Sequence, residues 1–346
     1  MRVREIARRH LWCLVETNSK EAEMQVPVNP VEKVEIITLE DNYIDLVSMD
    51  NTDVITRAVP LKGLELSNSI IAEHGFSALV RTTRAGQTKT MIFDFGFSTD
   101  VAARNAEALS LDLSQVEEAA LSHGHIDHFG GLGAVAEKTC RKGAKLVLHP
   151  SAYKRGRQIE PMPGIKVVLP GLKPGQAEKA GFTVVRTAAP YSMLDNTVLF
   201  LGEIPRETDF ERGMPNAYCE DETGGLARDS IEDDTGLVMH LSGKGLVVLS
   251  GCAHAGIVNT IRYAKKITGI DEVHVVMGGF HMAGPAFEGA IGPTVEALRE
   301  MAPAYVVPTH CTGRRAIMTF EREMPRSFIL NMAGTTLTFT GEQSTG

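Results

Sequence analysis

Four side chains that can ligate a metal ion fall within six positions of this sequence. His123, His125, Asp127 and His128 come directly after a short apolar stretch, where a strand would run into a loop. Buried polar groups packed this closely would cost desolvation free energy if they had no partner. A metal ion is such a partner, and imidazole and carboxylate ligands suit zinc, iron or manganese. The spacing therefore predicts a metal site on this loop.

Strand-like and helix-like stretches alternate on both sides of this loop, from residue 31 onward. Mixed β-sheets with helices on their outer faces are the natural packing for such an order. The expected helices cover 100–109, 130–143, 256–269 and 294–301, and the expected strands lie at 31–41, 77–83, 89–96, 116–121, 144–150, 182–189, 196–204, 235–242, 245–250, 271–279 and 304–309.

The domain organisation follows from the same reading. Residues 1–30 are predicted to be an N-terminal extension, and residues 31–346 one catalytic domain. Two segments, 151–175 and about 205–234, lack a clear period and are expected to be loops beside the active site. Disordered surface insertions are the alternative for both segments.

Composition limits the possible partners and the location. The chain of 346 residues has a formal net charge of −8, so nucleic acid is not an expected partner. It has no run of 18 apolar residues, so we expect no membrane span. Its five cysteines are widely spaced and odd in number, which favours a reducing, cytoplasmic location over a disulfide framework. The oligomeric state is left open.

The pattern His-x-His-x-Asp-His resembles the metallo-β-lactamase-fold superfamily, over roughly residues 32–340. The resemblance implies an α/β fold, an αββα sandwich of two mixed β-sheets flanked by helices. It also implies that His123 and His125 bind one metal ion and that Asp127 and His128 bind a second. Asp94 matches an aspartate at the end of an early strand, which would hold the metal loop in place.

The resemblance places further ligands at later strand ends. His254 and His310 are the candidates, and Asp127 is expected to be catalytic as well as a ligand. His281 is assigned to substrate binding or proton transfer, with metal-ligand and structural roles as alternatives. Most superfamily members also have a bridging aspartate, whereas this chain has Gly-Cys-Ala-His at 251–254. A Cys252 thiolate is one possible substitute, and a purely structural cysteine is the alternative.

The remaining histidines and the basic residues near the loops give weaker signals. A core or surface role is expected for five histidines: His10, His74, His149, His240 and His274. Five basic residues of the two loops could form a lip for a phosphate, although solvated charges are the more ordinary interpretation: Lys154, Arg155, Arg157, Arg206 and Arg228.

Six motifs narrow the resemblance to one branch of the superfamily. They are EHGFS, SHGHIDHFGG, FLGEIPRETDFE, SGCAHAGIVNTI, MGGFHM and PTHCTG. The branch is named after 7,8-dihydropterin-6-methyl-4-(β-D-ribofuranosyl)aminobenzene-5′-phosphate synthase, whose reaction joins a pterin to a ribofuranosyl aminobenzene phosphate and releases pyrophosphate. Glu203 and Arg206 match this branch and would line the substrate pocket, with a rigid surface turn as the alternative.

The resemblance implies a metal-dependent hydrolase or related transferase for a small anionic substrate, phosphorylated or an ester. Two zinc ions are expected, with manganese or iron as substitutes. Two ions about 3.5–4 Å apart can share a hydroxide and polarise a substrate oxygen. In the branch reaction they would bind pyrophosphate instead. A flavodiiron-like redox protein and a non-catalytic, metal-stabilised binding module are the alternative functions.

Overall fold

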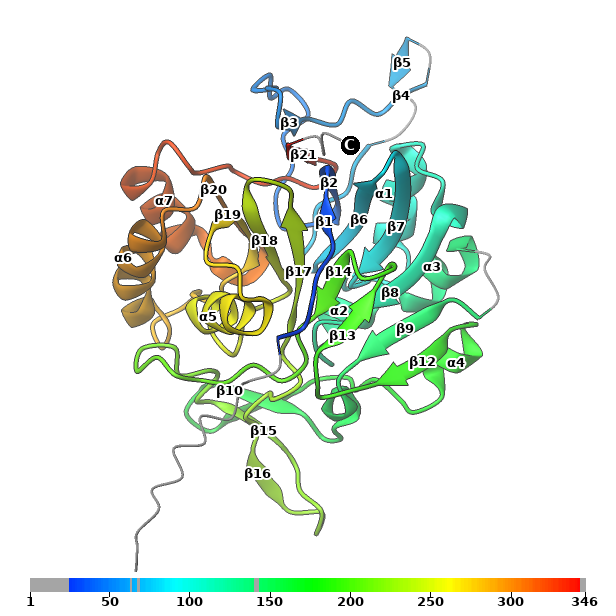
Figure 1. Cartoon of the computed structure of the whole chain (residues 1–346). Helices are drawn as coiled ribbons and strands as arrows, with labels where there is room; N and C mark the ends of the chain where they lie inside the picture. Colours follow the sequence, from blue (N-terminus) through cyan, green and yellow to red (C-terminus); the bar gives the residue numbers. More distant parts are fainter. Residues whose placement is uncertain (1–24, 63, 67–68, 140–142, 343–346) are drawn as a thin grey trace, which may run out of the picture.

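The computed structural model describes residues 25–342, apart from 63, 67–68 and 140–142 (Figure 1). Most of the predicted N-terminal extension, residues 1–24, lies outside the described residues. The part that is described runs along the second sheet. The backbone N–H of Val26 donates to the carbonyl of Ile267, and β1 (Pro30–Val31) pairs in parallel with β17 (Gly236–Leu241).

The first sheet contains eight strands in the order β12-β9-β8-β7-β6-β2-β21-β3. β6 and β7 form an antiparallel hairpin, and Ala85 and Gly86 between them both have positive φ angles, as a tight two-residue turn requires. The strands span β2 (Lys33–Glu40), β3 (Ile55–Thr56), β6 (Ser77–Arg84), β7 (Gln87–Phe93), β8 (Val116–Ala120), β9 (Lys145–Leu148), β12 (Thr183–Arg186) and β21 (Thr336–Thr340).

The second sheet has the order β13-β14-β17-β18-β19-β20, with β1 beside β17. Its last three strands are parallel and consist almost entirely of buried apolar residues, because helices and the other sheet cover both faces. The strands not yet given span β13 (Tyr191–Met193), β14 (Val198–Phe200), β18 (Gly245–Ser250), β19 (Val273–Gly279) and β20 (Tyr305–Thr309).

The two sheets pack face to face, and helices cover both outer faces (Figure 1). Side chains such as Phe93 and Val147 from the first sheet and Leu237 and Val247 from the second form one buried core. The predicted αββα sandwich is therefore confirmed. The first sheet carries α1 (Val101–Ala108), α3 (Leu132–Thr139) and α4 (Gln176–Lys179), and the second carries α5 (Ile257–Thr268), α6 (Ile291–Met301) and α7 (Arg314–Glu323).

The two segments expected to be loops contribute strands to one small antiparallel sheet. Its order is β11-β10-β15-β16, from β10 (Gln158–Met162), β11 (Ile165–Val168), β15 (Ala217–Glu220) and β16 (Leu226–Arg228). These strands are short and half-exposed, so they carry no clear apolar period. The pairing of β10 with β15 joins residues more than 50 positions apart, which no local pattern reports. A hairpin of β4 (Leu61–Lys62) and β5 (Glu65–Leu66) lies apart from these sheets.

Helices long and apolar enough to cross a bilayer are absent from the described part of the chain.

Glu40, at the end of β2, gives the fold a pH-dependent stability. Its carboxyl group is fully buried and accepts a hydrogen bond of 2.7 Å from the backbone N–H of Phe97. Burial raises the pKa of Glu40 from 4.5 to about 8, and the neighbouring Glu73 carboxylate acts in the same direction. Between these pH values the unfolded chain loses this proton while the folded chain keeps it. The free energy of unfolding should therefore fall as the pH rises from 4.5 to about 8.

We expect Glu40→Gln to remove this part of the pH dependence. The difference in stability between wild type and variant should change by up to about 1.4 kcal/mol per pH unit in that range. Urea unfolding at several pH values measures it, and comparison with the variant cancels the contributions of other titrating groups. Parallel curves for the two proteins would show that Glu40 titrates alike in the folded and unfolded states.

Candidate metal centre

The loop after β8 turns directly into a short helix, α2 (Ile126–Phe129), and buries the three histidines of the motif. His125 is the residue just before the helix, so Asp127 and His128 lie on its first turn. Gly124 is needed between His123 and His125, because a Cβ atom there would collide with the backbone carbonyl of Ala152. The close packing of this loop fixes the direction of its imidazole rings.

A first group of donor atoms consists of three imidazole nitrogens. Nε2 of His123 lies 2.9 Å from Nδ1 of His125 and 3.2 Å from Nε2 of His254, which follows β18. Burial lowers the pKa of His125 to about 4 and the pKa values of His123 and His254 well below 6.5. All three rings are therefore neutral at pH 7, and neutral imidazole is the form that binds metals.

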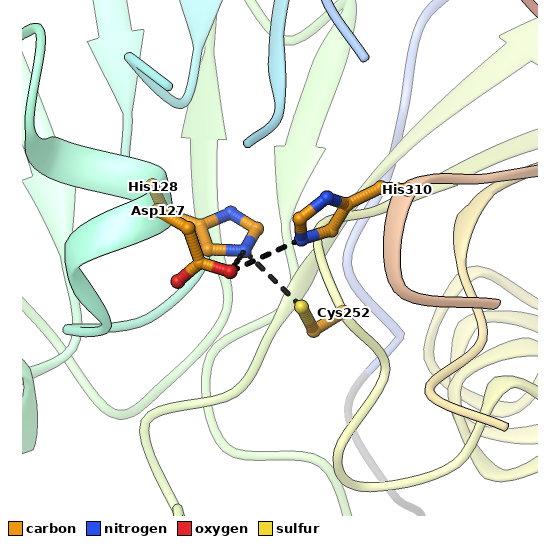
Figure 2. A group of neighbouring side chains, drawn as sticks. All are labelled: Asp127, His128, Cys252 and His310. Atoms are coloured by element: carbon orange, nitrogen blue, oxygen red, sulfur yellow. Dashed lines mark hydrogen bonds and ion pairs between the residues drawn. The ribbon is translucent and has the colours of Figure 1, made fainter. Parts of the chain in front are cut away.

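A second group consists of Asp127, His128 and His310 (Figure 2), and the ring centroid of His128 lies 4.2 Å from that of His123 in the first group. Oδ2 of Asp127 is 3.2 Å from Nε2 of His310 and 3.8 Å from Nε2 of His128. Burial disfavours the charged forms of Asp127 and His128. Attraction to neighbouring groups of opposite charge has the larger effect on both pKa values. The pKa of Asp127 is lowered, and Asp94 and Asp127 raise the pKa of His128 to about 9. His310 begins a 3-10 helix (His310–Thr312) after β20.

Both donor groups have the spacing of a metal-ligand shell. With zinc–nitrogen bonds of 2.0–2.1 Å, the ligand atoms of a tetrahedral site are about 3.3 Å apart. The separations in the two groups run from 2.9 to 3.8 Å. Nδ1 of His254 and Nε2 of His310 are buried and have no hydrogen-bond partner. The side chains present therefore fit divalent metal ions held by histidine and aspartate.

Asp94 lies directly behind His128. Its carboxylate accepts hydrogen bonds of 2.7 Å from the backbone N–H of Ser122, from the Ser122 hydroxyl and from Nδ1 of His128. With Nδ1–H directed at Asp94, Nε2 of His128 faces Asp127 and is the atom that would bind a metal ion after losing its proton. A second aspartate, Asp41, accepts a hydrogen bond of 2.8 Å from the backbone N–H of His310. Such outer partners orient ligands and are part of the site.

Asp41 and His74 were missed by the sequence analysis. His74 was expected to be incidental, but its Nε2 lies 3.7 Å from Oδ2 of Asp127, and its ring lies 4.7 Å from that of His310. Each flanks an apolar strand of the first sheet, at the edge that carries Asp94. The strand-end argument used for the later ligands would have found both.

His281 connects the donor groups to a cavity of about 450 Å³. Its ring centroid lies 4.3 Å from that of His254 and 4.7 Å from that of Phe287, and its Nδ1 is buried without a hydrogen-bond partner. The cavity also contacts the apolar Phe210 and the cation of Arg212. It can accept a flat apolar group close to the metal ligands.

Glu203 and Arg206 do not contact this cavity. Glu203 is exposed, with Oε2 4.0 Å from Nε2 of His149. Arg206 donates to the backbone carbonyl oxygens of His254, at 3.1 Å, and Ile231, at 3.3 Å. Arg206 thus braces the loop that carries His254, and the structure gives neither residue a place in the pocket lining.

Three basic residues of the first loop are paired with acids instead of forming an open lip: Lys154, Arg155 and Arg157. Arg157 is 1% exposed and contacts Asp229, at 2.9 Å, and Asp233, at 2.5 Å. Lys154 pairs with Asp229 at 2.9 Å and with Glu232. Solvated charge is therefore the wrong interpretation for Arg157, because two buried carboxylates enclose it.

Two consecutive aspartates tie this network to both ligand loops. Asp233 accepts a hydrogen bond of 2.8 Å from the backbone N–H of Gly124, between His123 and His125. Asp234 accepts one of 2.8 Å from the backbone N–H of Ala255, next to His254. The segment of Asp233 and Asp234 thereby fixes the position of the loop with His123 and His125 relative to the loop with His254.

Comparison with known proteins agrees with this geometry. A family model described as the metallo-beta-lactamase superfamily matches residues 71–310. The 7,8-dihydropterin-6-methyl-4-(beta-D-ribofuranosyl)-aminobenzene-5'-phosphate synthase of Methanocaldococcus jannaschii is 29% identical over 293 residues, which cover 84% of this chain and 98% of that protein. A crystal structure of Tm1679, described as a metal-dependent hydrolase of the beta-lactamase superfamily, is similar with a TM-score of 0.66 and 25% identity. It covers 89% of this chain and 99% of the other.

Proposed function

Because this chain belongs to the metallo-beta-lactamase superfamily, we propose that it is a dinuclear, metal-dependent enzyme acting on a small anionic substrate. One observation carries the proposal: two groups of donor side chains lie next to each other, and His254 of the first group also lines a cavity. The first group is His123, His125 and His254, and the second is Asp127, His128 and His310. When bound there, two divalent ions activate water and polarise a phosphoryl or carbonyl oxygen.

The protein's own residues would then hold and orient the substrate. Phe210 and Phe287 offer apolar surface for a ring, and Arg212 offers a cation for an anionic group at the same cavity. Nδ1 of His281 is available to hold a proton between the cavity and His254. A net charge of −8 does not oppose this arrangement, because cations inside the site dominate the local field.

The side chains that line the cavity bear on the choice between hydrolysis and group transfer, because they indicate which kind of substrate fits. Its aromatic lining favours a substrate with a planar ring. The similarity to the M. jannaschii synthase, named for a dihydropterin and an aminobenzene phosphate, suggests such a ring. We therefore take a pterin-type condensation as the second candidate function. A redox role of the flavodiiron kind is less well supported, because five imidazoles and only one carboxylate make up the two donor groups.

A substrate screen tests the proposal. The zinc, manganese and iron forms would be assayed against phosphomonoesters, phosphodiesters, lactones, thioesters and pterin pyrophosphates. We expect turnover with at least one class, loss of turnover after chelation, and recovery on adding metal back. Elemental analysis after purification without chelators is the control. Fewer than one tightly bound ion per chain, or a rate unaffected by chelation, would rule the proposal out.

A further inference from the structure

Cys252 lies between the two donor groups. Its Sγ is 3.1 Å from Nε2 of His128 (Figure 2). Within the described parts of the chain, it belongs to a cluster with Asp127, His128 and His310 and also to a cluster with His123 and His254. The ligating atoms of each cluster lie within 4.8 Å of one another. No other side chain in these two clusters is common to both. A third cluster joins Cys252 to His281 and Cys311.

No carboxylate takes this central position in the described structure. Asp127, at the other side of the second group, is the only acid in either cluster. The resemblance to the superfamily predicts a bridging aspartate, and the strand end after β18 provides Cys252 instead. Without a bridging ligand here, each group would have only its three donors and a gap on the side that faces the other group.

The backbone holds the thiol toward the centre. Cys252 is 2% exposed, and the carbonyl of the preceding Gly251 accepts a hydrogen bond of 2.9 Å from Gly279 at the end of β19. A Cβ atom at Gly279 would press on that carbonyl and on Sγ of Cys311. The strand ends can therefore approach closely only because Gly279 lacks a side chain. His310 belongs to the same cluster as Cys252, and its Nε2 has no hydrogen-bond partner.

We infer that Cys252 is a thiolate ligand shared by both metal ions, in the place of the bridging carboxylate. The inference rests on the proposed metal centre. On metal binding, the thiol loses its proton to solvent, and the sulfur would join Asp127, His128 and His310 at one ion and His123 and His254 at the other. A thiolate is a soft ligand, so the centre should select zinc or ferrous iron over magnesium and manganese.

Cobalt(II) substitution tests this ligand without any assay of turnover. We expect a thiolate-to-cobalt charge-transfer band in the near ultraviolet for the wild type, and loss of that band in Cys252→Ser. Cys311→Ser is the matched control, because Cys311 is equally buried at the same rim and directs its sulfur at the carbonyl of Cys252, 3.7 Å away. This control should keep the band.

Three outcomes overturn the inference. Bound cobalt with no band would make Cys252 a structural thiol, and loss of the band only in Cys311→Ser would assign the ligand to Cys311. If cobalt does not bind at all, the metal centre itself fails, and the proposed function fails with it. If cobalt binds with the band but no substrate is turned over, the ligand assignment stands and only the proposed activity fails.

A second variant, Cys252→Asp, tests the inference if Cys252→Ser does not fold. Cys252→Asp restores the carboxylate that the resemblance predicts, at a similar side-chain volume. We expect it to bind two ions without the charge-transfer band, and to have a higher affinity for manganese relative to zinc than the wild type has. An unchanged metal preference would contradict a bridging role for the sulfur.

Discussion

Replacing His125 with alanine is expected to lower turnover by more than about a hundredfold while the fold is retained. Substituting a residue that only supports a ligand typically costs about 10–100-fold in metal affinity or activity, and His125 supplies one of three nitrogens directly. Its ring is a neutral donor at pH 7, and the rest of the first group cannot move to replace it, because His123 and His254 are fully packed.

The rate with the best substrate, the bound metal per chain and the melting temperature would be measured together. His274→Ala is the matched control, since His274 packs on Tyr305 on the second sheet and belongs to neither donor group. A melting temperature lowered in His125→Ala with turnover unchanged would identify the site as a structural metal centre, as a binding module requires.

Replacing Arg157 with alanine is expected to cost about 3–5 kcal/mol of stability. The substitution leaves the buried carboxylate of Asp233 without its countercharge and leaves Asp229 with Lys154 alone. Because Asp233 also holds the backbone of Gly124, metal affinity should fall as well. Urea unfolding of the metal-free protein measures the first effect, and metal titration measures the second.

Arg155→Ala provides the comparison for this result. Arg155 is two positions away, is exposed, and pairs only with the partly exposed Glu220, so its loss should change stability by less than about 1 kcal/mol. If Arg157→Ala does not fold, neutralising both aspartates in the same chain should recover part of the loss. Equal stabilities of Arg155→Ala and Arg157→Ala would show that the buried network contributes nothing.

The parts of the site that the sequence predicts best are those encoded locally. The four ligating residues between His123 and His128 fall within six consecutive positions. Their types and spacing therefore indicate a metal loop without any knowledge of the fold. His254 and His310 follow buried apolar strands, and parallel strands end at the same edge of a sheet. The alternating strands and helices likewise predicted mixed sheets with helices on their outer faces, because strands and helices differ in hydrophobic period. The sandwich of two sheets was implied by the resemblance to the superfamily.

The parts that were not predictable depend on contacts between distant segments. Arg157 lies among other basic residues and looks like a surface charge until Asp229 and Asp233, more than 70 positions later, fold around it. The small sheet arises in the same way, since neither β10 nor β15 has a period of its own. Arg206 matches a branch motif, but only the folded chain shows that it braces the backbone of His254.

The separation of the ligands along the chain has a consequence for how the protein is made. His123 and His254 are 131 positions apart, and His310 lies near the end of the sequence. During synthesis, the early histidines leave the ribosome long before their partners on the second sheet exist. An ion that needs the whole donor set can therefore be acquired only after His310 has been synthesised, and bound metal would mark the molecules in which the two sheets have come together.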